Sequence, residues 1–176
     1  GTTMTAPLSG KTALVTGGGT GIGRGVALGL AQAGCQVTIT GRREEPLKET
    51  ASLFDGTPSI LYRTLDVADR QAVNETIAAA SEEMGRIDIL VNCAGINIAK
   101  RMMSDIDPAD WDKVLQVNAT GAFNCVHAAL TGMRDRKDGV IINICSISGL
   151  RSSRIGVSTS PGWMLVTRIL FSSSST

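Results

Sequence analysis

Aromatic residues, excess charge and long hydrophobic runs are all scarce in this sequence. Aromatic side chains make up 3% of the chain and the net charge is +1, so neither base stacking nor a basic surface favours nucleic acid or an anionic membrane as a partner. No apolar run approaches the roughly 18 residues of a membrane-spanning helix, and the first residues lack the pattern of a signal peptide. We therefore expect a cytoplasmic protein with no membrane or nucleic-acid partner.

Cysteine is also scarce. The chain has four, Cys35, Cys93, Cys125 and Cys145, and no two of them form a C-x-x-C pair. Each lies in an apolar stretch, where a free thiol packs as a small hydrophobic residue. We expect buried, reduced thiols and no metal site; a zinc site or a disulfide is the less favoured alternative.

Short β-type runs alternate with longer stretches of helical periodicity along most of the chain. Strands are predicted at residues 12–16, 36–40, 59–65, 87–91 and 139–145, and helices at 22–33, 44–54, 69–84 and 108–134. The apolar stripe of the last helix consists of Trp111, Val114, Leu115, Phe123, Val126 and Leu130. The alternation predicts an α/β fold with a doubly wound parallel sheet of Rossmann type and helices on both faces, in three layers.

A glycine-rich turn with the sequence TGGGTGIG joins the first predicted strand to the first helix at residues 16–23. Gly17 can take the tight turn, Gly21 lets backbone N–H groups approach a pyrophosphate, and Gly23 lets the helix pack closely. No Gly-Lys-Ser/Thr follows, so the turn is not a P-loop. The turn predicts a dinucleotide site, with a merely flexible turn as the alternative. Thr20 and Ile22 complete its expected cofactor contacts.

The glycine spacing resembles the T-G-x-x-x-G-x-G of the short-chain dehydrogenase/reductase family. Asn92-Cys93-Ala94-Gly95 is similar to that family's N-N-A-G with one substitution, and Asp66-Val67 resembles its adenine-holding pair. Asn118 and Ser146 match the family's active-site asparagine and serine. The resemblance is continuous from about residue 9 to residue 149. It implies that Asp66, Val67, Asn92, Ala94 and Gly95 contact the cofactor.

The resemblance also implies an activity. Members of the family transfer a hydride between a nicotinamide cofactor and a carbonyl or secondary alcohol, so a small-molecule substrate is expected. Ser146 would hydrogen-bond the substrate oxygen, and Asn118 would hold a water in the proton relay. The complete protein is expected to be a homo-oligomer, because the family often dimerises through its long fourth helix and the neighbouring helix.

The residues after the second predicted strand bear on the choice of cofactor. NAD-specific sites place an acidic side chain there for the ribose 2′-hydroxyl, whereas this chain has Gly41-Arg42-Arg43. Two arginines suit a 2′-phosphate through charge-assisted hydrogen bonds. We therefore expect NADP, with NAD as the alternative; solvated surface charge is the other interpretation of Arg42 and Arg43.

The family's catalytic Tyr-x-x-x-Lys pair is absent from this sequence. The pair is expected about a dozen residues after the serine, but the only tyrosine is Tyr62 and the last lysine is Lys137. Thr159 and Trp163 stand roughly at the two positions, and neither side chain can replace the pair in acid–base chemistry. A non-catalytic nucleotide-binding or partner-binding remnant is therefore an alternative function. A methyltransferase is a third, which Gly41 disfavours.

Residues 150–176 show no clear pattern. In one interpretation, 158–171 is a degenerate active-site helix, although Pro161-Gly162 interrupts it. In the favoured one, 160–164 resembles the Pro-Gly segment after the family's sixth strand and the stretch before it is missing; an unrelated tail is the third. The C-terminal strands are then missing or degraded, which leaves the edge of the fifth strand largely unpaired and prone to self-association.

The domain organisation follows from these patterns. Residues 1–9 are expected to be a flexible leader, and residues 10–149 a dinucleotide-binding Rossmann domain. Residues 150–176 are expected to be a degraded or discontinuous C-terminal segment of the same domain.

Overall fold

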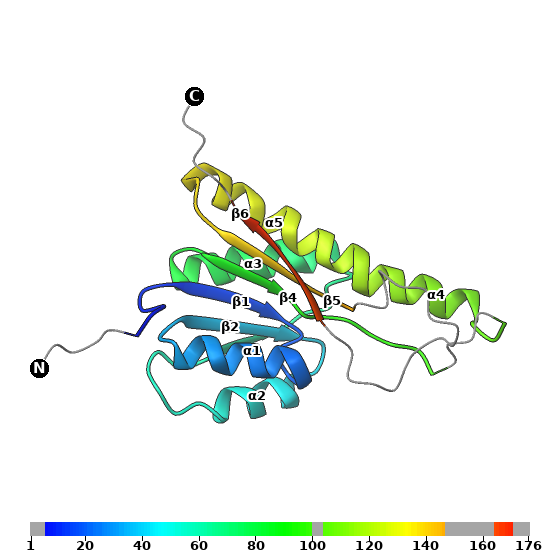
Figure 1. Ribbon diagram of the computed structural model, residues 1–176, viewed down its shortest axis with the longest axis horizontal. Coiled ribbons are helices and arrows are strands. Elements are labelled where there is room, and N and C mark those ends of the chain that lie inside the picture. Colours follow the sequence, from blue (N-terminus) through cyan, green and yellow to red (C-terminus); the bar gives the residue numbers. More distant parts are fainter. Residues whose placement is uncertain (1–5, 100–103, 147–163, 171–176) are drawn as a thin grey trace, which may run out of the picture.

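The computed structural model describes residues 6–99, 104–146 and 164–170. Its centre is a six-stranded sheet of order β3-β2-β1-β4-β5-β6 (Figure 1). The first five strands are parallel: β1 (Thr12–Thr16), β2 (Gln36–Gly41), β3 (Leu61–Thr64), β4 (Ile89–Asn92) and β5 (Val140–Ser146). The predicted Rossmann-type parallel sheet is confirmed, and each predicted strand lies within two residues of an observed one.

Helices cover both faces of the sheet, as the alternation predicts (Figure 1). Helices α1 (Gly21–Gln32) and α2 (Glu44–Ser52) lie on one face, and α3 (Arg70–Met84) and α5 (Gly121–Arg136) on the other. Side chains of β1 alternate between the two cores: Ala13 and Val15 pack toward α1, and Leu14 packs toward α3 and α5. Because successive side chains of a strand point to opposite faces, β1 contributes apolar side chains to both hydrophobic cores.

Local chemistry determines where several helices begin and end. The carboxylate of Asp69 accepts a hydrogen bond from the Ala72 N–H, and Gly85 closes α3 in the left-handed conformation with φ of 84°. The carboxylate of Asp107 caps α4 (Pro108–Leu115) by accepting from the Ala109 N–H at 2.8 Å. Short polar side chains at N-caps and glycine after the last turn are the usual end signals of helices.

The long helix predicted at 108–134 differs from expectation in two ways. A π-helical segment, η1 (Gln116–Thr120), separates α4 from α5, and α4 has no buried residue. Three residues of the predicted apolar stripe, Trp111, Leu115 and Phe123, are exposed. The buried side of α5 instead consists of Gly121, Asn124, Cys125, Ala129 and Met133. Three of these residues, Gly121, Cys125 and Ala129, are small and let α5 pack closely against the core beside α3, whereas Met133 is one of the largest buried side chains.

The tail corrects the expectation of an unpaired edge. Strand β6 (Met164–Leu170) pairs antiparallel with the whole of β5, from Val140 opposite Leu170 to Ser146 opposite Met164. The degenerate active-site helix, the less favoured interpretation of 158–171, is therefore wrong for 164–170, and the backbone groups of the β5 edge have partners. Residues 158–163, which include Thr159 and Pro161-Gly162, lie outside the described residues.

Part of the expected leader is structured. Residues 7–10 form a turn, the Leu8 N–H donates to the Ala33 carbonyl oxygen at 2.9 Å, and Leu8 packs against the core beneath α1. Within the described chain, no helix has both the length and the hydropathy needed to cross a bilayer.

Candidate cofactor-binding site

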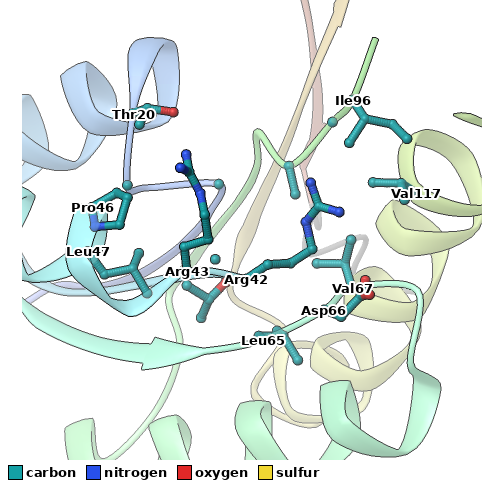
Figure 2. A pocket seen from close by; sticks show the side chains of 16 residues that line it. Thr20, Arg42, Arg43, Pro46, Leu47, Leu65, Asp66, Val67, Ile96 and Val117 are labelled. Atoms are coloured by element: carbon teal, nitrogen blue, oxygen red, sulfur yellow. The ribbon is translucent and has the colours of Figure 1, made fainter. Parts of the chain in front are cut away.

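A pocket lies at the carboxyl ends of the parallel strands, where the strand order reverses between β1 and β4 (Figure 2). In open α/β sheets this is the position at which ligands bind. Eight predicted cofactor contacts line the pocket: Gly17, Thr20, Arg42, Arg43, Asp66, Val67, Ala94 and Gly95. Segments far apart in the sequence therefore meet around one cavity.

The glycine-rich turn approaches the β4 end without side chains between them. Gly17 has φ of +67°, and a Cβ on it would lie 2.9 Å from the backbone nitrogen of Ala94. A Cβ on Gly23 would overlap the carbonyl oxygen of Gly17. Gly21, with φ of +54°, opens α1. Neither Gly21 nor Gly23 lines the pocket, so both shape the turn rather than its wall.

The N-terminus of α1 leaves donors available. Thr20 is the N-cap but makes no side-chain cap hydrogen bond, and the first turn contains no acidic residue. The N–H groups of a first helical turn, together with the helix dipole, favour an anion. Ile22 is 55% exposed and does not line the pocket, so the structure places it beside the turn rather than in the site.

A buried hydroxyl connects the glycine-rich turn to the strand opposite. Oγ1 of Thr16, a residue that is 1% exposed, accepts from the N–H groups of Cys93 and Ala94, each at 3.1 Å. The start of the N-C-A-G segment is thereby held against β1. This contact explains why a threonine, and not a larger apolar residue, ends β1.

Asn92 lies in the sheet and not in the pocket wall. Its side chain is buried, and its Nδ2 donates to Oδ1 of Asn143 on β5 at 2.8 Å. The hydrogen bond joins β4 to β5 below the site. Asn92 therefore helps to hold two strands together and does not line the pocket.

Asn118 sits in the π-helical segment and binds the backbone of Ile96 with both ends of its amide. Its Oδ1 accepts from the Ile96 N–H at 2.8 Å, and its Nδ2 donates to the Ile96 carbonyl at 2.9 Å. Ile96 lines the pocket beside Gly95. The amide of Asn118 therefore holds one wall of the site in place.

The two arginines after β2 are exposed and face the pocket. Figure 2 shows Arg43 on the side of Thr20 and Arg42 on the side of Asp66 and Val67. Among the described residues, neither has a hydrogen-bond or ion-pair partner. The neighbouring Glu44 and Glu45 pair instead with Lys48, at 3.4 and 3.3 Å.

The carboxylates nearest the arginines have other partners. Hydrogen bonds to Glu45 and then to Glu44 raise the pKa of Lys48, in line with the two ion pairs. Asp66 lines the pocket as well, and its Oδ1 accepts from the Ala68 N–H at 3.0 Å. The cationic groups of Arg42 and Arg43 therefore remain free for an anionic ligand.

Several lining residues lack any motif that would mark them in the sequence: Thr40, Pro46, Leu47, Leu65, Ile96 and Val117. Thr40 is the most informative, because its Oγ1 is buried and has no hydrogen-bond partner in the described part of the chain. It lies next to Gly41, the last residue of β2. Its position at the end of a predicted strand is the signal that could have identified it.

Ser146 is the last residue of β5. In the register of the sheet it lies three residues beyond Asn143, which is opposite Asn92 on β4. Its backbone is therefore at the same edge of the sheet as the pocket. Its side chain lies outside what the structure describes.

The four cysteines are free, but only two are buried as expected. Cys35 and Cys125 are buried, Cys93 is half-buried and Cys145 is exposed. Burial raises the pKa of Cys93 to about 11 and that of Cys125 to about 12. The pKa of Cys35 is also raised to about 11, by burial first and by the charge of Asp88 second. Nothing in residues 6–99, 104–146 and 164–170 brings together three His, Cys, Asp or Glu side chains that could hold a metal.

Cysteine reactivity should follow this order. At pH 8 the three thiols with raised pKa stay protonated, and the thiolate is the form that reacts. Iodoacetamide should therefore modify Cys145 first, and Cys35 and Cys125 only after unfolding. Peptide mass spectrometry over a time course measures this order. Equal rates at Cys125 and Cys145 in the folded chain would contradict the burial described above.

The pocket suits a ligand with phosphate groups. It combines glycines that leave the backbone bare, a helix N-terminus without acidic residues and two arginines that have no ion-pair partner in the described part of the chain. Each of these features favours phosphate oxygens. The residues present therefore fit a nucleotide that carries several phosphates.

Curated relatives point in the same direction. A protein of Gibberella zeae called a short chain dehydrogenase/reductase is 37% identical over 141 residues, which cover 79% of this chain and 52% of that protein. An acetoacetyl-CoA reductase of Shinella zoogloeoides is 38% identical, over 79% of this chain and 56% of the relative. The chain thus spans only a little more than half the length of these relatives.

Solved structures and a family model agree with the relatives. A putative short-chain alcohol dehydrogenase from Sinorhizobium meliloti 1021 matches with a TM-score of 0.77 and 38% identity, over 90% of this chain and 61% of that one. Levodione reductase matches with a TM-score of 0.79 and 32% identity, over 85% of this chain and 58% of that one. The family model described as short chain dehydrogenase matches residues 11–159. This chain therefore belongs to the short-chain dehydrogenase/reductase family of oxidoreductases.

Proposed function

We propose that the chain binds NADP(H) in the pocket of Figure 2, and that the complete protein is a cytoplasmic, homo-oligomeric oxidoreductase acting on a carbonyl or secondary alcohol. The observation that carries the choice of NADP(H) over NAD(H) is the pair Arg42 and Arg43. Both line the pocket directly after β2, without a carboxylate partner in the described chain. An NAD-specific site would use an acidic residue in this region.

The proposal gives the other lining residues separate tasks. The N-terminus of α1, with Thr20, receives the pyrophosphate. Asp66 and Val67 border the adenine, and Ala94 and Gly95 lie alongside the rest of the dinucleotide. When bound, the nicotinamide supplies hydride chemistry, for which the protein provides orientation and electrostatics.

Ser146 and Asn118 are the chain's proposed contributions to catalysis. Ser146 ends β5 at the edge that holds the pocket, and its hydroxyl would hydrogen-bond the substrate oxygen. Asn118 holds Ile96 through its amide, so any water that it keeps in the proton relay needs another of its atoms, such as its carbonyl oxygen. Asn118 is thus first a positioning residue.

The acid–base pair has no counterpart in the sequence, where Tyr62 in β3 is the only tyrosine. The second candidate function, cofactor binding without catalysis, rests on this observation. Carbonyl reduction by the chain as given is expected to remain near the rate without enzyme, because proton transfer by a placed side chain contributes about 10²–10⁴-fold. Turnover that depends on Ser146 would favour the catalytic function over the second candidate.

Cofactor preference tests the proposal. NADPH should bind this chain about 10–100-fold more tightly than NADH, as expected for one or two hydrogen bonds to a charged group. Arg42→Ala should remove most of that preference while changing the affinity for NADH little. The matched control is Arg134→Ala, since Arg134 is also exposed but lies in the last turn of α5.

Isothermal titration of both cofactors, with S-adenosylmethionine as a third ligand, makes the measurement. Equal affinities for NADPH and NADH in the unaltered chain would refute the NADP assignment. Binding of S-adenosylmethionine alone would favour a methyltransferase.

A further inference from the structure

We propose that Arg24 is a positioning residue that sets affinity and selectivity for the cofactor by holding the glycine-rich turn against α2. This inference rests on the proposed NADP(H) function. Arg24 lies one turn into α1 and does not line the pocket. It connects the turn at Gly19 to Glu49 and Thr50 in the second half of α2. The first turns of the same helix supply Pro46 and Leu47 to the pocket wall and directly follow Arg42 and Arg43.

The carbonyl oxygen of Gly19 is the meeting point. It accepts from Nη2 of Arg24 at 2.7 Å, from Nε of Arg24 at 3.2 Å and from Oγ1 of Thr50 at 3.2 Å. Nε of Arg24 also lies 3.0 Å from Oγ1 of Thr50 on α2. The short bond from Nη2, with the Nε and Thr50 protons close by, leaves the peptide group little freedom to rotate.

The orientation of the Gly19 carbonyl also determines the orientation of the Thr20 N–H. In a planar trans peptide the carbonyl of one residue and the N–H of the next point in opposite directions. Because the Gly19 carbonyl is held toward Arg24 and Thr50, the N–H of Thr20 is turned away from α2. Gly19 and Thr20 both line the pocket, and Thr20 caps α1, so this N–H belongs to the proposed pyrophosphate-binding turn.

Contacts of Arg24 and Thr50 also hold α2, which forms the other wall of the pocket. Thr50 is fully buried, and its Oγ1 also lies 3.0 Å from the carbonyl oxygen of Pro46. Arg24 forms an ion pair with Glu49 on α2, with Nη2 and Oε2 3.0 Å apart. A Cβ on Gly19 would lie only 3.0 Å from Cβ of Pro46. The turn and the first turns of α2 are therefore packed directly against each other.

The effect on selectivity between NADPH and NADH depends on which parts of each cofactor contact the glycine-rich turn and which contact the residues before α2. The pyrophosphate, common to NADPH and NADH, needs the turn. The 2′-phosphate of NADPH also needs Arg42 and Arg43, which are positioned by the start of α2. Loss of Arg24 releases the two walls from each other, so NADPH loses more affinity than NADH. A residue with only a general effect on stability would weaken both cofactors equally.

The experiment compares Arg24→Met with Arg63→Met. Both arginines form an ion pair with a glutamate on another secondary-structure element. Arg63 pairs with Glu83 at 2.8 Å, which joins β3 to α3 and does not involve the glycine-rich turn. Dissociation constants for NADPH and NADH are measured, together with amide hydrogen exchange of residues 18–23 without cofactor. Arg24→Met should weaken NADPH about tenfold and NADH about threefold, and should accelerate exchange in the turn. Arg63→Met should do neither.

Two further variants keep the proposal testable if Arg24→Met does not fold. Arg24→Lys restores the charge and one donor, so it should recover part of the selectivity. Glu49→Gln removes only the ion pair with α2 and should reduce selectivity by less than Arg24→Met. An unchanged NADPH-to-NADH ratio together with unchanged exchange in the folded Arg24 variants would overturn the role of Arg24. Equal affinities in the unaltered chain would instead refute the NADP(H) function, while accelerated exchange would still support the structural part of the inference.

Discussion

Gly23→Ala is expected to abolish cofactor binding and to lower the free energy of unfolding by about 3 kcal/mol. A Cβ at this position would overlap the Gly17 carbonyl oxygen and lie 2.7 Å from the Gly17 carbonyl carbon. Both are backbone atoms, so no side chain can rotate away. The turn has to move as a unit, which displaces the donors at the start of α1 and the contact between Gly17 and Ala94.

Gly25→Ala is the control for Gly23→Ala. Gly25 lies in the same helix two residues later, and nothing surrounds the position of its Cβ within 4 Å. Alanine in an exposed helix interior stabilises by about 0.5–1 kcal/mol relative to glycine. Urea unfolding and cofactor titration of both variants should therefore give changes of opposite sign in stability. Normal cofactor binding by Gly23→Ala would show that the turn does not pack as described.

Asp88→Ala has the second large expected effect, a loss of about 2 kcal/mol in the free energy of unfolding. Asp88 is 4% exposed, at the opposite end of the sheet from the pocket. Its Oδ2 accepts from the Thr12 N–H at 3.0 Å, and its Oδ1 faces Nε of Arg86 at 2.8 Å. Alanine leaves the buried Thr12 N–H without its acceptor, which is costly in the interior. Arg86 contributes less, because its side chain is 44% exposed and water can solvate it.

Asp138→Ala supplies the comparison for Asp88→Ala. Asp138 forms an ion pair with Lys11 at 3.8 Å with its side chain 63% exposed. Exposed pairs of this kind contribute about 0–1 kcal/mol, so the variant should unfold at nearly the same urea concentration as the unaltered chain. Cofactor affinity should change little in either variant that remains folded, because neither aspartate lines the pocket. Equal losses of stability in the two variants would contradict the structural role of Asp88.

The sequence predicts the fold well where local patterns decide it. The β-branched run of 36–40, the glycine-rich turn of 16–23 and the cap at Asp69 each act through neighbours in the chain. The order of the motifs then brings Gly17, Asp66 and Ala94 to one edge of a parallel sheet, since the carboxyl ends of parallel strands meet there. Most predicted cofactor contacts are found in the pocket for this reason.

Contacts between distant segments account for what the sequence did not predict. The pairing of β6 with β5 joins Met164 to Ser146 and Leu170 to Val140, and no periodicity in either strand specifies that partner. Asn92 bonds to Asn143 rather than lining the pocket, which depends on the face of β4 on which it lies. Thr40 lines the site because β2 ends there, a feature that its residue type does not reveal.

The most direct test of the central claim is the location of NADP⁺ on the folded chain. Backbone amide chemical shifts are recorded during a titration with NADP⁺ and, separately, with NAD⁺. The account predicts that NADP⁺ produces its largest shifts at residues 17–23, 41–43, 65–67 and 94–96, and that only the shifts at 41–43 are much smaller with NAD⁺. Saturable shifts centred elsewhere, for example in the groove of Ile77, Ala129 and Arg136 between α3 and α5, would contradict it.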